Sequence, residues 1–284
     1  MSEEQLGFVG VGNMGGAMAL RARERGVALT VFDLAPAAQE RLTAAGATVV
    51  ASPAEVARRS SVVSVVVNYD QDVIDAVLGT DGVLDGASPG LVIAIHSTIH
   101  LETLERVIGA CSERGVTVVD AAVTGGVEAA QRGELAVLLG GSDDAVARVR
   151  SAIGSYASVV LHAGASGAGL SAKLAVNLIG FAKMAAAHEG LALAHAAGVD
   201  VVALAEVLAH AERQSGQHEF YLAARSQAFA RGGDANLEAI GRHESPKSQK
   251  DLHAALELGR RVGVELPVAA VIHDLMPEVW AVAR

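Results

Sequence analysis

A glycine-rich loop close to the first residue has the spacing of a phosphate-binding turn. The pattern G-x-G-x-x-G spans residues 10–15, between the apolar run Leu6–Gly10 and the helix-like segment Asn13–Arg25. The first glycine permits a tight turn, the second lets the backbone approach a pyrophosphate, and the third lets helix and strand pack closely. Free N–H groups at the helix start attract the anion. The predicted dinucleotide contacts are Gly10, Gly12, Asn13, Met14 and Gly15.

Asp33 ends the next apolar run, at the distance typical of an acid that accepts hydrogen bonds from the adenosine ribose. A carboxylate at this position would repel a 2′-phosphate, and no basic residue lies between Asp33 and Arg41. We therefore predict NAD as the cofactor, with NADP less favoured. The alternative is a structural strand–helix turn followed by an unrelated aspartate.

Two polar segments follow later apolar runs. His96-Ser97-Thr98-Ile99 comes after Leu91–Ile95, and the segment from Asp120 to Gly126 comes after Val116–Val119. Ligands of open α/β sheets bind at the carboxyl ends of the strands. The hydroxyl and glycine N–H groups of the second segment could hold a small anion such as a carboxylate. Ordinary turn chemistry explains both segments equally well.

Lys173 and Asn177 are four residues apart in an otherwise apolar helix-like segment, so they share one face. A partly buried lysine can have a lowered pKa and exchange protons near neutral pH. The alternative is a lysine whose stem lies on apolar surface while its amine reaches water, next to a hydrogen-bonded asparagine.

These candidates require a dinucleotide-binding domain followed by a helical one. Short apolar runs alternate with helix-like segments in the first half, which indicates a parallel sheet covered on both faces. After about residue 164 almost all segments have helical spacing. We predict a Rossmann-type α/β domain at 1–163 and an all-helical substrate or dimerisation domain at 164–284, joined by a long interdomain helix. The helices expected in the second domain are Ala165–Ala197, Val201–Ala211, Glu219–Arg231, Ser248–Val262 and Val268–Val282.

Composition excludes several classes of protein. The chain has 284 residues, 51% of them hydrophobic, and a net charge of −10. An acidic chain is not expected to bind nucleic acid nonspecifically. The single cysteine, Cys111, allows no internal disulfide, which fits a cytoplasmic protein. No secretory signal or uninterrupted membrane span is expected.

Five motifs in order give the chain a resemblance to the β-hydroxyacid dehydrogenases, the family of 3-hydroxyisobutyrate dehydrogenase and tartronate semialdehyde reductase. The motifs are GVGNMGGAMA at 10–19, HSTI at 96–99, DAAVTGG at 120–126, GASGAGLSAKLAVN at 164–177 and KDL at 250–252. The resemblance covers nearly the whole chain. It implies hydride transfer between a nicotinamide and a small 3-hydroxy carboxylate, or reduction of its semialdehyde, by a homodimer or homotetramer.

The resemblance also implies roles for individual residues. Lys173 would exchange a proton with the substrate oxygen, and Asn177 would orient the substrate. The carboxylate-binding turn would be Thr124, Gly125 and Gly126. The remaining cofactor contacts would be Val67 and Asn68 after the fourth strand, Thr98 at the nicotinamide end, and Lys250 closing over cofactor and substrate.

Three departures from the family pattern bear on the substrate. Thr124 stands where the family usually has serine, and its extra methyl group narrows the pocket. His96 replaces a residue that is often acidic or small. The segment Asn236–Gln249, before Lys250, is more polar than the family pattern.

The histidines are expected to serve packing, interface or surface roles. No Cys, Asp or Glu cluster accompanies His96 and His100, so no metal site is predicted. His243 and His253 are further candidates for substrate contact.

Two other functions are compatible with the architecture. An imine reductase would have the same architecture but generally lacks the lysine at the position of Lys173. A noncatalytic NAD-binding or interaction module would not need all five motifs.

Overall fold

The computed structural model describes residues 5–231 and 235–282, which form two compact units. The first unit is Met1–Asn177 and the second is Leu178–Arg284. The Rossmann-type first part and the helical second part confirm the predicted fold class.

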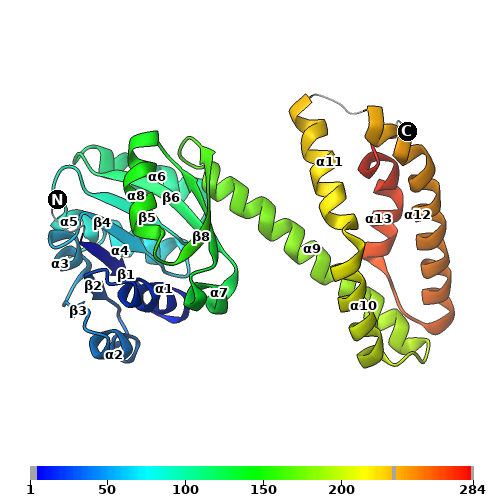
Figure 1. The fold of residues 1–284 in the computed structure, drawn as a ribbon, viewed down its shortest axis with the longest axis horizontal. Helices are drawn as coiled ribbons and strands as arrows, with labels where there is room; N and C mark the ends of the chain where they lie inside the picture. The colour runs from blue at the N-terminus through cyan, green and yellow to red at the C-terminus, as the bar shows by residue number, and fades with distance from the viewer. Residues whose placement is uncertain (1–4, 232–234, 283–284) are drawn as a thin grey trace. The chain divides into compact units, whose positions relative to one another are not determined.

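A single sheet in the described part of the first unit has the strand order β3-β2-β1-β4-β5-β6-β7-β8 (Figure 1). The order reverses between β1 and β4, and ligands of such sheets bind beside this reversal. The strands are β1 (Leu6–Val9), β2 (Leu29–Phe32), β3 (Thr48–Val49), β4 (Val62–Val65), β5 (Val92–Ile95), β6 (Thr117–Thr124), β7 (Leu135–Gly140) and β8 (Ala157–Gly164).

One strand pair departs from the predicted parallel sheet. β6 and β7 are antiparallel, with Asp120 opposite Gly140 and Thr124 opposite Ala136. The physical reason is the short connection at residues 125–134, because a parallel crossover needs a dozen or more residues. β6 is also longer than predicted. Residues 120–124 belong to the strand, so Asp120 lies inside the sheet instead of in the loop after it.

Helices cover both faces of the sheet. Alternate strand residues enter two separate cores: Val92 and Ala94 of β5 enter one, while Ile93 and Ile95 enter the other. The helices of the first core are α1 (Asn13–Glu24), α2 (Pro36–Ala44), α7 (Gly126–Arg132) and α8 (Asp143–Ile153). The helices of the second core are α3 (Pro53–Arg58), α4 (Asp70–Leu78), α5 (Val83–Gly86) and α6 (Leu101–Ser112).

Helix α9 (Ala168–Ala196) starts in the first unit and continues into the second. Within the described residues it alone has the length and apolar composition to cross a membrane, with a mean hydropathy of 1.3. A core helix of a soluble protein meets the same criterion. The helix also carries Lys173, Asn177 and the buried Glu189.

The rest of the second unit is helical, as predicted. Its helices are α10 (Val201–Ser215), α11 (Gln217–Arg231), α12 (Ala235–Val262) and α13 (Pro267–Val279). The α12 boundary was predicted at Ser248 and is wrong, because the polar segment before it is also helical. Ion pairs one turn apart, Arg242 with Glu238 and Lys247 with Glu244, lie along this part of the helix. The side chain of Asn236 lies outside the described residues.

The second unit leaves many large apolar side chains exposed. Its fully buried apolar residues, among those described, are Ala228, Leu237 and Leu266. Exposed side chains on α9, α10 and α11 include Leu178, Phe181, Met184, Val202 and Phe229.

Candidate active site

The glycine loop joins β1 to α1, and each of its three glycines occupies a different environment. Gly10 has φ +87°, and a Cβ atom there would overlap the carbonyl oxygen of Val66. A Cβ atom at Gly15 would overlap the carbonyl oxygen of Gly10. Gly12 is exposed, and a Cβ atom there would have no neighbour within 4 Å. The loop is therefore tightly packed at Gly10 and Gly15, while the space around Gly12 is open.

The start of α1 is available to an anion. Gly12 is the residue before the helix, and no side chain caps α1. The first N–H groups of a helix have no partner within it, and they carry a partial positive charge. The open space at Gly12 and these N–H groups fit the pyrophosphate of a dinucleotide.

Asp33 lies beside this loop, directly after β2. Its Oδ2 accepts a hydrogen bond from the Val11 N–H at 2.7 Å, and its Oδ1 accepts one from the Ala35 N–H at 2.8 Å. Each carboxylate oxygen can accept a further hydrogen bond. The neighbouring Leu34 side chain is 90% exposed and brings no positive charge. The geometry fits a carboxylate that is fixed by the loop and free to accept from ribose hydroxyls.

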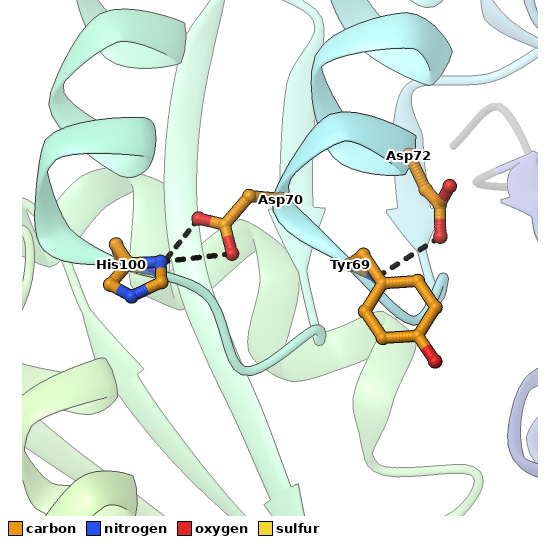
Figure 2. Close-up of polar contacts among 4 residues, drawn as sticks. All are labelled: Tyr69, Asp70, Asp72 and His100. Carbon is orange, nitrogen blue, oxygen red and sulfur yellow. Dashed lines mark hydrogen bonds and ion pairs between the residues drawn. The ribbon is translucent and has the colours of Figure 1, made fainter.

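The loops after β4 and β5 are tied together. Ser97 Oγ donates to the Val67 carbonyl at 2.7 Å and accepts from the Val67 N–H at 3.0 Å. A second connection joins the starts of α4 and α6, where His100 N and Nδ1 contact the Asp70 carboxylate at 2.9 and 3.1 Å (Figure 2). Hydrogen bonds from Thr103 and His100 lower the pKa of Asp70. Asn68 and Thr98 stay exposed at this edge.

His96 points into the core. Its Nδ1 contacts the Ala121 carbonyl at 2.6 Å, so Nδ1 carries the proton, and Nε2 lies 3.1 Å from Ser64 Oγ and 3.3 Å from Tyr156 Oη. Burial lowers the pKa of His96 to about 4, so the imidazole is neutral near pH 7. The histidine joins three strands beneath the Ser97–Thr98 loop, a packing role of the kind expected for it.

The turn after β6 carries the predicted carboxylate-binding residues. Thr124 is the last residue of the strand and is partly buried, while Gly125 and Gly126 are exposed. Both glycines have positive φ, +127° and +79°, which a side chain would disfavour. The turn opens into α7, which packs against α1. The dinucleotide loop leads into α1 and this turn leads into α7, so the packing of these two helices connects them.

Lys173 and Asn177 lie on the second turn of α9 and just beyond it, and both are partly exposed. Burial lowers the pKa of Lys173. Within residues 5–231 and 235–282, neither side chain makes a hydrogen bond or an ion pair. A partly desolvated amine without a partner is available to a ligand or a reacting group.

The residue that fixes the start of α9 was not recognised as such from the sequence. The carboxylate of Asp120 is 3% exposed and accepts hydrogen bonds from the N–H groups of Gly167 and Leu170, both at 2.8 Å. The sequence placed Asp120 in the carboxylate-binding segment. Asp120 was expected in a loop after the strand, so its contact with α9, which begins far along the chain, was not predicted.

Lys250, His243 and His253 lie on α12 in the second unit. All three are exposed, and Lys250 Nζ pairs with Asp251 Oδ1 at 3.1 Å. His253 Nε2 lies 3.7 Å from Glu257 Oε1. Among the described residues no group of three or more His, Cys, Asp or Glu side chains could hold a metal ion.

Two family models together match almost the whole chain. The NAD-binding domain of 6-phosphogluconate dehydrogenase matches residues 5–164, and the NAD-binding domain of NADP-dependent 3-hydroxyisobutyrate dehydrogenase matches residues 167–283. The chain belongs to the β-hydroxyacid dehydrogenase family. The first unit is thus an NAD-binding domain of an oxidoreductase, which confirms the predicted enzyme and cofactor class.

Individual relatives agree with the family assignment. A 3-hydroxyisobutyrate dehydrogenase of Pseudomonas aeruginosa is 32% identical over 95% of this chain and 90% of its own length. An NAD-dependent L-serine dehydrogenase of the same species is 33% identical over 72% of this chain and 69% of its own length. The crystal structure of an oxidoreductase from Mycobacterium avium 104 is 35% identical, has a TM-score of 0.86, and covers 98% of this chain and 99% of its own.

Proposed function

We propose that this β-hydroxyacid dehydrogenase oxidises a small carboxylate that carries a hydroxyl on carbon 3, or reduces the corresponding aldehyde. Lys173 carries the proposal, because it is a half-buried amine with a lowered pKa and no partner among the described residues. The named substrates of the two relatives, 3-hydroxyisobutyrate and L-serine, are both carboxylates with a hydroxyl on carbon 3.

In the proposed site, NAD supplies the hydride acceptor when it is bound. Its contacts in the first unit would be Gly10, Gly12, Asn13, Met14, Gly15, Asp33, Val67, Asn68 and Thr98, and Lys250 stays a prediction from the sequence. The carboxylate of Asp33 favours NAD, because it can accept from two ribose hydroxyls and would repel a 2′-phosphate. The predicted domains are 1–163, which would bind NAD, and 164–284, which would serve the substrate or dimerisation.

The chain's own residues handle the proton and the substrate. The Thr124 hydroxyl and the Gly125 and Gly126 N–H groups hold the substrate carboxylate, and the Asn177 amide orients the alcohol. When the alcohol is oxidised, neutral Lys173 would accept the proton of the substrate hydroxyl. In the reverse direction the ammonium returns that proton to the oxygen.

A second copy of the chain would cover the exposed apolar side chains of the second unit. Leu178, Phe181 and Met184 are exposed on α9, Val202 on α10 and Phe229 on α11. A soluble, cytoplasmic homodimer or homotetramer accounts for this composition better than a monomer. Light scattering at several protein concentrations tests the assembly.

The function is tested with a panel of 3-hydroxy carboxylates and NAD, using the wild type and Lys173→Ala. We expect turnover of at least one substrate by the wild type and a large loss in the variant. Cyclic imines in the same panel test the imine reductase alternative. Turnover of imines alone, or full activity in Lys173→Ala, would reject the proposal.

A further inference from the structure

Asp120 is a buried carboxylate, and hydrogen bonds from backbone N–H groups offset the cost of burying its charge. It is 3% exposed, and no ion pair among the described residues includes it. Its two oxygens accept from the N–H groups of Gly167 and Leu170 at 2.8 Å. Burying a carboxylate without such partners is costly. The N-terminus of a long helix, with its partial positive charge, offsets that cost.

The two hydrogen bonds form a capping box assembled from distant parts of the chain. Helix α9 starts at Ala168, so Gly167 is its N-cap and Leu170 its third residue. In an ordinary capping box the side chains of these two positions accept from each other's N–H groups. Glycine and leucine cannot do so. The carboxylate of Asp120, from strand β6, replaces both acceptors and ties the first turn of α9 to the sheet.

Two glycines make room for this contact. Gly140 lies opposite Asp120 on β7, and a Cβ atom there would be 2.5 Å from both carboxylate oxygens. A Cβ atom at Gly169 would be 2.5 Å from the Leu138 carbonyl oxygen and 2.7 Å from Gly140 N. The first turn of α9 therefore lies in backbone contact with the sheet, and small displacements are sterically resisted.

The same turn sets the rotation of the helix. Leu170 is 1% exposed and packs in the core formed by the helices of the second face. Lys173 and Asn177 follow it by three and seven residues, so they continue its face. Asp120 and Thr124 are four residues apart on β6 and point to one side of the sheet. Strand β6 thus carries both Asp120, which caps the first turn of α9, and Thr124, which begins the predicted carboxylate-binding turn.

We propose that Asp120 is a positioning residue, which fixes Lys173 relative to the Thr124–Gly126 turn by clamping the first turn of α9. The inference rests on the proposed function, since it assigns Asp120 a part in the same reaction. The inference does not require a direct contact between Asp120 and the substrate. The expected signature is a loss of turnover without a loss of cofactor binding.

The first test is Asp120→Asn, which keeps the shape but turns an NH2 group toward one of the two N–H donors. We expect kcat to fall between about tenfold and hundredfold, because small misplacements of a catalytic group cost that much. The dissociation constant of NAD, measured by calorimetry, should stay within about threefold, since this change leaves the glycine loop and Asp33 intact.

Glu189→Gln is the matched control. Glu189 is 8% exposed and accepts from the N–H groups of Val268 and Ala269 at 2.7 and 2.9 Å, at the start of α13. The control therefore breaks the same kind of cap on another helix. Its melting temperature should fall as in Asp120→Asn, while kcat stays within about threefold of the wild type. An equal loss of kcat in both variants would show general destabilisation and overturn the inference.

Leu170→Met provides a second test if Asp120→Asn does not fold. The change keeps the volume of the side chain but loosens the anchor that sets the rotation of α9. Leu104→Met is its control, because Leu104 is also 1% exposed and lies in the same core on α6. We expect kcat of Leu170→Met to be at least about threefold below that of the control. Equal values would overturn the inference.

These results are distinguishable from a failure of the proposed function. A wild type inactive on the whole substrate panel, or an active Lys173→Ala, rejects the function itself. An active wild type, an inactive Lys173→Ala and an Asp120→Asn variant with normal kcat reject only the role of Asp120.

Discussion

The glycine loop after β1 and the start of α9 prepare the molecule for ligands in different ways. The loop offers backbone groups: Gly10 and Gly15 pack closely against the backbone around Val66, while the space at Gly12 is open. The start of α9 offers side chains, because Lys173 and Asn177 have no partners among the described residues. Changes at the loop should therefore alter cofactor affinity, and changes at α9 should alter turnover.

Lys173→Ala should give the largest loss of turnover, and it should separate the effect of α9 on kcat from the effect of the glycine loop on cofactor affinity most clearly. We expect kcat to fall by about 10² to 10⁴, the usual contribution of a general acid or base. Affinity for NAD should change by less than about threefold, measured by fluorescence titration. Lys183→Ala is the control, since Lys183 is exposed on the same helix. A loss of NAD affinity as large as the loss of kcat would break the comparison.

Gly12→Ala tests the other region. Gly12 has φ −62°, outside the left-handed region, and a Cβ atom there would meet no protein atom within 4 Å. The methyl group would instead occupy the space expected for the pyrophosphate, so we expect NAD to bind about tenfold or more weakly, measured by calorimetry. The melting temperature should not change. Gly109→Ala, on α6 with equally open surroundings, should leave NAD binding unchanged.

The pH profile tests the state of Lys173 directly. Oxidation of an alcohol needs the neutral amine, whose fraction rises with pH up to the pKa of Lys173. Because burial lowers that pKa below the ordinary value of 10.5, the rise in kcat/KM should level off below pH 10.5. Below the pKa the slope should be about tenfold per pH unit. The same slope in Lys173→Ala would assign the titration to another group.

Asp33→Asn should have the smallest effect. The amide keeps a hydrogen-bond acceptor but removes the charge that repels a 2′-phosphate, so the preference for NAD over NADP should fall by about threefold to tenfold. The measurement is the ratio of kcat/KM values with the two cofactors. An unchanged ratio would mean that the preference originates elsewhere.

The sequence predicted those parts of the molecule that depend on local patterns. The loop at Gly10–Gly15, the helix that follows it and the helical second half follow from short-range spacing. Helix α3 was missed because its six residues give too little periodicity, and the nine residues of α2 were not predicted as a helix either. The end of β6 was missed because the small residues Ala121 and Ala122 carry no strong strand signal.

Contacts between distant residues could not be predicted in the same way. The cap of α9 joins Asp120 to Gly167 and Leu170, and the cap of α13 joins Glu189 to Val268. Neither has a local sequence pattern, since the acceptor and donor come from different elements. The contacts of His96 with Ala121, Ser64 and Tyr156 likewise join residues that are far apart in the sequence, and only the tertiary packing decides its direction.

Cys111 has a practical consequence for experiments on this protein. It is the only cysteine in the chain, it is fully buried, and burial raises its pKa to about 11. The thiolate that reacts with maleimides is therefore scarce and shielded near pH 7. A cysteine introduced on the exposed surface of α9 or α12 would be the one site labelled. Fluorophores or spin labels could then be attached at that site while Cys111 stays in the core.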